Sequence, residues 1–259
     1  MPKGFWDSRG PIAIAHRGGD GAGKDKENTP AAFQTAHQLG YKYAEIDVIK
    51  AASGELAVVH GTYNWFQAGV SRGISSRVLQ TMTFDQICNL IRPGGQPYVP
   101  TVEEILTGFP KLKFVIDVKT DEVVLPLVRL LKRLDAFGRV IISDNDYPRC
   151  LKLIRACGRQ QASVSVGLTV GRGLPFRNIN IFLLKSGRLK GIDTIFLHHS
   201  LVSAPMISLI HHRGFKAVVW TANSSLGIKH ALRSGADGVT SDRVELLKEL
   251  IESRQSHIP

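Results

Sequence analysis

Short apolar runs alternate along this chain with stretches whose apolar residues recur at helical spacing. Such alternation is typical of parallel strands joined by crossover helices. The runs predict eight strands, at Ile12–His16, Tyr43–Val48, Lys113–Val118, Val140–Ser143, Ser163–Leu168, Ile192–Leu197, Lys216–Trp220 and Gly238–Thr240. Eight such units predict a (β/α)₈ TIM barrel, expected as one domain over residues 1–259. A doubly wound open sheet is the alternative, and no Gly-x-Gly-x-x-Gly turn supports it.

The helical stretches carry recognisable start and stop signals. A helix is expected from Pro30 to Leu39, since Asn28 or Thr29 can cap it and Gly40 ends it. Other helices are expected at 84–91, 102–106, 122–134, 224–233 and 243–252. After the second strand, Ser53-Gly54 predicts a turn and Leu56–His60 a return strand, which opens an irregular excursion over about residues 55–100.

Polar residues gather where the predicted strands end. In a TIM barrel these ends form the active-site face. The residues are His16, Arg17, Glu45, Asp47, Asp117, Lys119, Ser143, Asp144, Thr169, His198, Trp220, Asn223, Thr240 and Asp242.

Three carboxylates among them suggest a metal site. Glu45 and Asp47 are two residues apart on one strand and therefore point the same way, and Asp117 ends the next barrel strand. A set of oxygen donors alone favours Mg²⁺ or Ca²⁺ over zinc. The alternative is that these carboxylates pair with Arg17 and Lys119.

Two histidines flank this cluster. His16 ends the first strand and His60 ends the return strand. Imidazole titrates near neutral pH, so the two can act as general acid and general base. Arg17 and Lys119 can hold a phosphate, and the ring of Trp220 can wall a substrate pocket.

Composition narrows the partners. The net charge is +11, and residues 146–259 hold 16 Lys and Arg against 7 Asp and Glu. This asymmetry favours an anionic partner, although a solvated basic face explains it equally well. No basic helix or aromatic platform of a nucleic-acid module appears, so nucleic acid is not expected. Three unpaired cysteines, no leader-like segment and no apolar run of spanning length predict a cytoplasmic protein.

These residues together resemble the glycerophosphodiester phosphodiesterase family. The motifs are His16-Arg17-Gly18, Glu27-Asn28-Thr29, Glu45-x-Asp47, His60, Asp117-x-Lys119 and Val219-Trp220-Thr221-x-Asn223. The resemblance implies a divalent cation on Glu45, Asp47 and Asp117, with His16 and His60 as the acid/base pair. It also implies phosphate contacts from Arg17 and Lys119, a supporting role for Glu27 near the metal or around His16, and a cyclic phosphate that is then hydrolysed.

Two departures bear on substrate choice. Gly61 stands where the family usually has Asp, and Asp117 where it commonly has Glu. Asp-x-Lys at this place also resembles the sphingomyelinase D-type phospholipases. The expected substrate is a glycerophosphodiester or a lysophospholipid. The rival interpretations are a phospholipase D-like enzyme whose product stays cyclic and a non-catalytic barrel that binds anionic lipid.

One further segment suggests a membrane contact. Residues 171–190 mix apolar side chains with cations and follow the fifth predicted strand. They are expected either to rest on an anionic bilayer, making the protein peripheral to the membrane, or to pack on the barrel. The sequence leaves the oligomeric state open.

Overall fold

The computed structural model describes residues 5–6, 10–23, 26–60, 74–91, 99–159, 164–171 and 189–255. Its strands are β1 Ile12–Ala15, β2 Tyr43–Lys50, β3 Leu56–Val58, β4 Lys113–Val118, β5 Val140–Asp144, β6 Ser165–Val170, β7 Thr194–His198, β8 Lys216–Trp220 and β9 Gly238–Ser241. Its α-helices are α1 Pro30–Gln38, α2 Ser76–Leu79, α3 Phe84–Ile91, α4 Val102–Gly108, α5 Val124–Arg133, α6 Tyr147–Arg159, α8 Ala204–His212, α9 Ser225–Arg233 and α10 Val244–Gln255.

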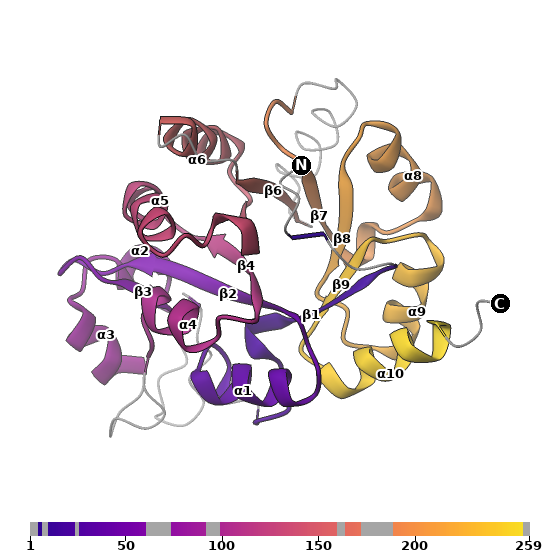
Figure 1. Cartoon of the computed structure of the whole chain (residues 1–259), viewed down its shortest axis with the longest axis horizontal. Helices are drawn as coiled ribbons and strands as arrows, with labels where there is room; N and C mark the ends of the chain where they lie inside the picture. Colours follow the sequence, from indigo (N-terminus) through magenta and orange to yellow (C-terminus); the bar gives the residue numbers. More distant parts are fainter. Residues whose placement is uncertain are drawn as a thin grey trace.

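Eight of these strands close into a parallel barrel within the described part of the chain. Their order is β1-β2-β4-β5-β6-β7-β8-β9, and β9 pairs with β1 to complete the ring. The helices surround the sheet (Figure 1). The predicted (β/α)₈ fold is therefore confirmed. The return strand is also confirmed, because β3 pairs antiparallel with the end of β2.

The differences from the prediction lie mostly in helices that the sequence reading omitted. Helices α2, α6 and α8 were not predicted; α6 and α8 complete crossovers that parallel strands require. The fifth barrel strand begins and ends about two residues later than expected, because its alternating apolar run continues to Val170. In the excursion the helix at 84–91 is confirmed. Nearly all of the cationic segment 171–190 lies outside the described residues.

Strand β2 explains how carboxylates come to face the barrel interior. All but the last of its residues are buried. Ile46 points outward and joins the layer between sheet and helices that contains Phe33 of α1. Since side chains alternate on a strand, Glu45 and Asp47 point inward. Below them the barrel is filled by an apolar cluster that includes Tyr43, Val115 and Phe196.

A tight turn follows β1 and orients His16 and Arg17. Arg17 (φ 53°), Gly18 (φ 88°) and Gly19 (φ 79°) all adopt positive φ. A Cβ on Gly18 would lie 2.6 Å from the Ala32 Cβ and 2.9 Å from the Ala32 carbonyl carbon. Only glycine therefore allows this turn to lie against the start of α1.

In the described part of the chain, no helix is both long enough and apolar enough to cross a bilayer.

We predict that Gly18→Ala lowers the free energy of unfolding by about 2–4 kcal/mol, because positive-φ strain and overpacking act together. Gly138→Ala is the matched control, since nothing lies within 4 Å of its added Cβ and its φ is not positive. Urea denaturation of both variants measures the effect. Equal stability of the Gly18 variant and the wild type would contradict it.

Candidate active site

A cavity of about 350 Å³ opens at the carboxyl ends of the barrel strands. It brings together residues that lie far apart in the sequence. Eight of the nine predicted site residues line it: His16, Arg17, Glu45, Asp47, His60, Asp117, Lys119 and Trp220. Glu27 instead lines an adjoining cavity, which also contains His16 and Arg17.

Glu45, Asp47 and Asp117 form a cluster of carboxylates. Each offers an oxygen, and these three oxygens lie within 4.8 Å of one another. The register aligns Asp47 with Asp117 across the β2–β4 pair. Asp47 is only 1% exposed. Asn28, which also has a positive φ, donates its side-chain amide to Asp47 at 3.1 Å.

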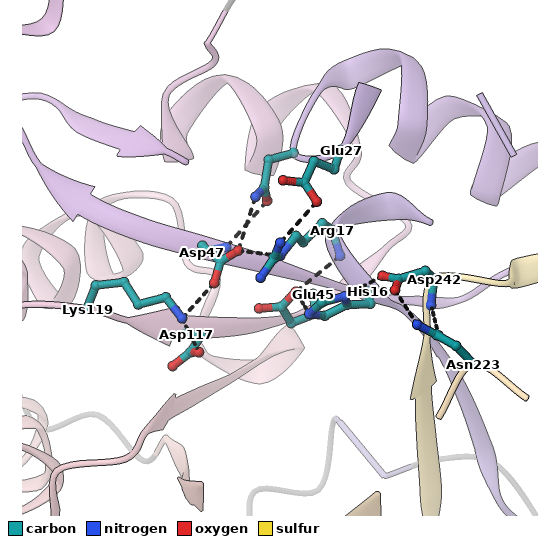
Figure 2. A network of polar contacts seen from close by, with 10 residues as sticks. His16, Arg17, Glu27, Glu45, Asp47, Asp117, Lys119, Asn223 and Asp242 are labelled. Atoms are coloured by element: carbon teal, nitrogen blue, oxygen red, sulfur yellow. Dashed lines mark hydrogen bonds and ion pairs between the residues drawn. The ribbon is translucent and has the colours of Figure 1, made fainter. Parts of the chain in front are cut away.

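Two cations neutralise part of this negative charge. The Arg17 guanidinium lies 2.8 Å from Asp47 through Nε and donates to Glu27 at 3.0 Å through an NH group. The Lys119 ammonium lies 2.7 Å from Asp47 and 2.5 Å from Asp117 (Figure 2). The two alternatives raised by the sequence are thus not exclusive, because the carboxylates form both a cluster and ion pairs.

The carboxylates differ in how readily they ionise. Burial raises the pKa of Glu45 to about 8, reinforced by the negative charge of Asp47. Burial also acts to raise the pKa of Asp47, but Lys119 and Arg17 outweigh it and hold that pKa well below its usual range. The pKa of Asp117 is raised, by burial first and by Asp47 as well, against the opposing charge of Lys119. The positive charges of Lys119 and Arg17 therefore outweigh the effect of burial at Asp47, but not at Glu45 or Asp117.

A divalent cation fits this donor set. Two oxygens on one ion lie at most twice the metal–oxygen distance apart, about 4.1 Å for Mg²⁺ and about 5 Å for Ca²⁺. The three oxygens, which all lie within 4.8 Å of one another, are close enough to approach a single ion of this kind. A bound cation would also favour the ionised form of Glu45, which burial disfavours.

His16 is held from the side of β9, which pairs with β1 on the edge away from β2. Its Nδ1 donates to Asp242 at 2.5 Å, and its Nε2 lies 3.8 Å from Glu45. Asn223 donates its side-chain amide to Asp242 at 2.5 Å and accepts the backbone N–H of Asp242 at 2.9 Å (Figure 2). Burial by itself lowers the pKa of His16, but the hydrogen bond to Asp242 and the charge of Glu45 raise it overall.

His60 has the opposite electrostatic character. Burial lowers its pKa to about 4, which the negative charge of Asp47 only partly offsets. Its position is fixed by the preceding residue, since Val59 donates its backbone N–H to the Asp47 carbonyl at 2.9 Å. The pKa values of the two imidazoles in the cavity are therefore shifted in opposite directions, upward for His16 and downward for His60.

The remaining predicted residues lie at the edge of the cluster. Glu27 accepts a hydrogen bond from Arg17 and so helps to orient that guanidinium. Trp220 donates its indole N–H to the Phe196 carbonyl at 3.0 Å, which fixes its ring on the cavity wall. The edge of the His198 ring meets Trp220, with ring centroids 5.2 Å apart, and His198 does not line the cavity.

Asp144, at the end of β5, takes no part in the cluster. It is fully buried and forms an ion pair with Arg149 of α6 at 2.6 Å. Burial raises its pKa to about 7 against the opposing charge of Arg149. Its role is to join β5 to α6.

The sequence suggested only a helix-capping role for Asn28 and no role for Asn223 and Asp242. Each lies in one of the motifs named above or at the end of a predicted strand, and that position was the sequence feature that could have marked it as part of the site. Their function as hydrogen-bond partners depends on contacts between residues as many as 226 positions apart, which spacing does not encode.

Comparisons with known proteins point to one family. Residues 16–136 match the model of the Glycerophosphoryl diester phosphodiesterase family. A Mycobacterium tuberculosis protein named "Probable glycerophosphodiester phosphodiesterase 2" is 26% identical over 250 residues, covering 95% of this chain and 92% of that protein. The mouse protein named lysophospholipase D GDPD1 is 26% identical over 272 residues, covering 93% of this chain and 86% of its own length.

Solved structures share the fold. An Oleispira antarctica phosphodiesterase, determined in complex with the product sn-glycerol-3-phosphate, superposes with a TM-score of 0.71 at 20% identity. The match covers 94% of this chain and 97% of that one. The resemblance to the glycerophosphodiester phosphodiesterases is therefore confirmed.

We predict that Asp242→Asn lowers the pKa of His16, because the aspartate charge and hydrogen bond are what raise it. The protonated fraction of His16 at neutral pH then falls, which ¹⁵N NMR of the imidazole nitrogens measures. Asp20→Asn is the control, since its carboxylate pairs with Arg243. An unchanged His16 titration in the Asp242 variant would contradict the assignment.

Proposed function

We infer that this chain is a member of the glycerophosphodiester phosphodiesterase family and a phosphoric diester hydrolase. The observation that carries this is the single cavity in which three carboxylates, two cations and two histidines converge. The family match over residues 16–136 includes all of these groups.

The proposed substrates are glycerophosphodiesters and lysophospholipids. Hydrolysis of one phosphoester bond would release an alcohol and a phosphomonoester. Names among the relatives support both classes, since they include a glycerophosphodiester phosphodiesterase and a lysophospholipase D. The chain has free cysteines at Cys88, Cys150 and Cys157, which supports a reducing, cytoplasmic location.

The proposed cofactor is one divalent cation, Mg²⁺ or Ca²⁺, held by Glu45, Asp47 and Asp117. When bound it supplies positive charge that polarises a phosphoryl oxygen. Arg17 and Lys119 line the same cavity and add two permanent positive charges toward a phosphate. Glu27 and Asn28 hold the Arg17 and Asp47 side chains in place.

The two histidines suit opposite proton transfers. His60, with its pKa near 4, is neutral at pH 7 and can accept the proton of an attacking hydroxyl. His16, whose pKa Asp242 helps to raise, can donate a proton to the leaving alcohol. In the proposed sequence a substrate hydroxyl beside the phosphoester attacks phosphorus, the alcohol leaves with the proton from His16, and a cyclic phosphate forms. Water then opens the ring, with the roles of the histidines reversed.

Product analysis distinguishes this proposal from its rivals. We expect turnover of a panel of glycerophosphodiesters and lysophospholipids that EDTA abolishes and Mg²⁺ or Ca²⁺ restores. Phosphorus NMR should show a phosphomonoester at the end of the reaction. A cyclic phosphate as the final product would favour the phospholipase D-like alternative. No turnover with any substrate and metal would favour the non-catalytic barrel.

We predict that His16→Ala and His60→Ala each reduce kcat by about 10²–10⁴-fold, the usual contribution of one acid or base group. Thermal melting should show that both variants remain folded. His37→Ala is the matched control, because that histidine is exposed on α1 and does not line the cavity. Full activity in either site variant would overturn the acid/base assignment.

A further inference from the structure

Three large apolar side chains are exposed in the described part of the chain. Val78 is 51% exposed, Leu125 49% and Leu226 82%. Single exposed apolar residues are common on soluble proteins and need no special explanation. These three differ in that they share one end of the barrel.

The topology places them around the opening of the candidate active site. Leu125 is the second residue of α5, which follows β4, and Leu226 is the second residue of α9, which follows β8. A helix that follows a barrel strand begins at the strand's carboxyl end, where the cavity opens. Val78 belongs to α2, whose first residue, Ser76, lines the cavity itself.

Two of them flank the opening from opposite sides. In the barrel order β1-β2-β4-β5-β6-β7-β8-β9, strands β4 and β8 stand four places apart in a ring of eight. Figure 1 shows α5 and α9 on opposite sides of the sheet. A flat apolar surface brought against this end would therefore meet side chains on both sides of the cavity at once.

An exposed cation accompanies each apolar side chain. Arg77 adjoins Val78, Arg129 is four residues after Leu125, and Lys229 is three residues after Leu226. Residues three or four apart on a helix share a face, so Arg129 and Lys229 lie one turn behind the apolar tips. None of these three cations forms an ion pair with a residue that the structure describes. In the turn before Leu125, Asp121 forms an ion pair with Lys152. Glu122 is the other acid of this turn, and its negative charge opposes the attraction of an anionic surface.

We propose that this surface, made of Val78, Leu125, Leu226, Arg77, Arg129 and Lys229 and called here the rim surface, docks on an anionic lipid bilayer. In a bilayer the apolar acyl chains lie deeper than the anionic headgroups. The exposed apolar side chains of α5 and α9 would reach the acyl chains, while Arg129 and Lys229, one helical turn farther from the membrane, would meet the headgroups. The net charge of +11 adds long-range attraction. Docking in this orientation holds the cavity against the membrane, so that a lysophospholipid reaches the site directly. This last step rests on the proposed function, whereas the docking does not.

Vesicle binding tests the rim surface. The Val78→Ser/Leu125→Ser/Leu226→Ser variant should bind vesicles of phosphatidylserine and phosphatidylcholine about tenfold or more weakly than the wild type at low salt. Arg129→Gln should weaken binding more than Lys132→Gln, its exposed counterpart in the last turn of the same helix. Equal binding by the triple variant and the wild type, or wild-type failure to bind any vesicle, would overturn the proposal. The second result would favour a protein partner at this surface.

Depth measurement tests the orientation. Leu226→Trp should be quenched by brominated lipid beyond the wild-type signal, and Gln38→Trp should not. Gln38 is exposed at the far end of α1, where the chain enters β2 at the opposite end of the barrel. Equal quenching of the two added tryptophans would show that binding has no preferred face and would overturn the orientation.

Activity separates docking from catalysis. The triple serine variant should turn over a water-soluble glycerophosphodiester at the wild-type rate and hydrolyse vesicle-borne lysophospholipid several-fold more slowly. An equal loss on both substrates would overturn the docking role. If no substrate is hydrolysed by the wild type, the proposed function fails while the binding and quenching results still decide the docking.

Discussion

The structure depends on accommodating two like charges on one buried strand. Glu45 and Asp47 point into the barrel because Ile46 between them is needed in the layer beneath α1. An unpaired buried carboxylate is costly, so the surrounding elements supply compensation. Arg17 from the turn after β1 and Lys119 from the end of β4 approach Asp47 from its two sides. Among the described residues, Glu45 accepts the Arg17 backbone N–H at 3.1 Å and lies 3.8 Å from the His16 imidazole, and it forms no close ion pair with Arg17 or Lys119. This imbalance supports the proposal of an added cation at the centre.

Barrel closure is what completes the geometry proposed for catalysis. His16 follows the first strand and Asp242 the last, and the two meet because β9 pairs with β1. Asn223, at the end of β8, extends this contact by one more strand. His16 is therefore positioned by residues near the C-terminal end of the chain, while the proposed metal ligands come from the first half. The family match, which spans residues 16–136, covers the proposed ligands but does not reach Asn223 and Asp242.

Much of the fold and the set of site residues could be predicted from the sequence. Period-two apolar runs located the strands, and the barrel rule assigned their carboxyl ends to one face. The predicted ligands and histidines do line one cavity. Pairing of the carboxylates with Arg17 and Lys119 was foreseen as an alternative, but the individual partners were not: Asp242 contacts His16, and Glu27 contacts Arg17. Side-chain partners depend on rotamers and strand stagger, which the spacing of residues along the chain does not encode.

The short antiparallel strand β3 holds both ends of the excursion that follows it. It pairs with the end of β2, and Val59 donates its backbone N–H to the Asp47 carbonyl. In addition, Val58 donates its backbone N–H to the Pro100 carbonyl, and Ala57 pairs with Thr101. The chain therefore leaves β3 at His60 and returns to it at Pro100. Because the entropy cost of closing a loop grows only slowly with its length, an insertion between these two ends would add little to the cost of folding and would leave both ends where they are.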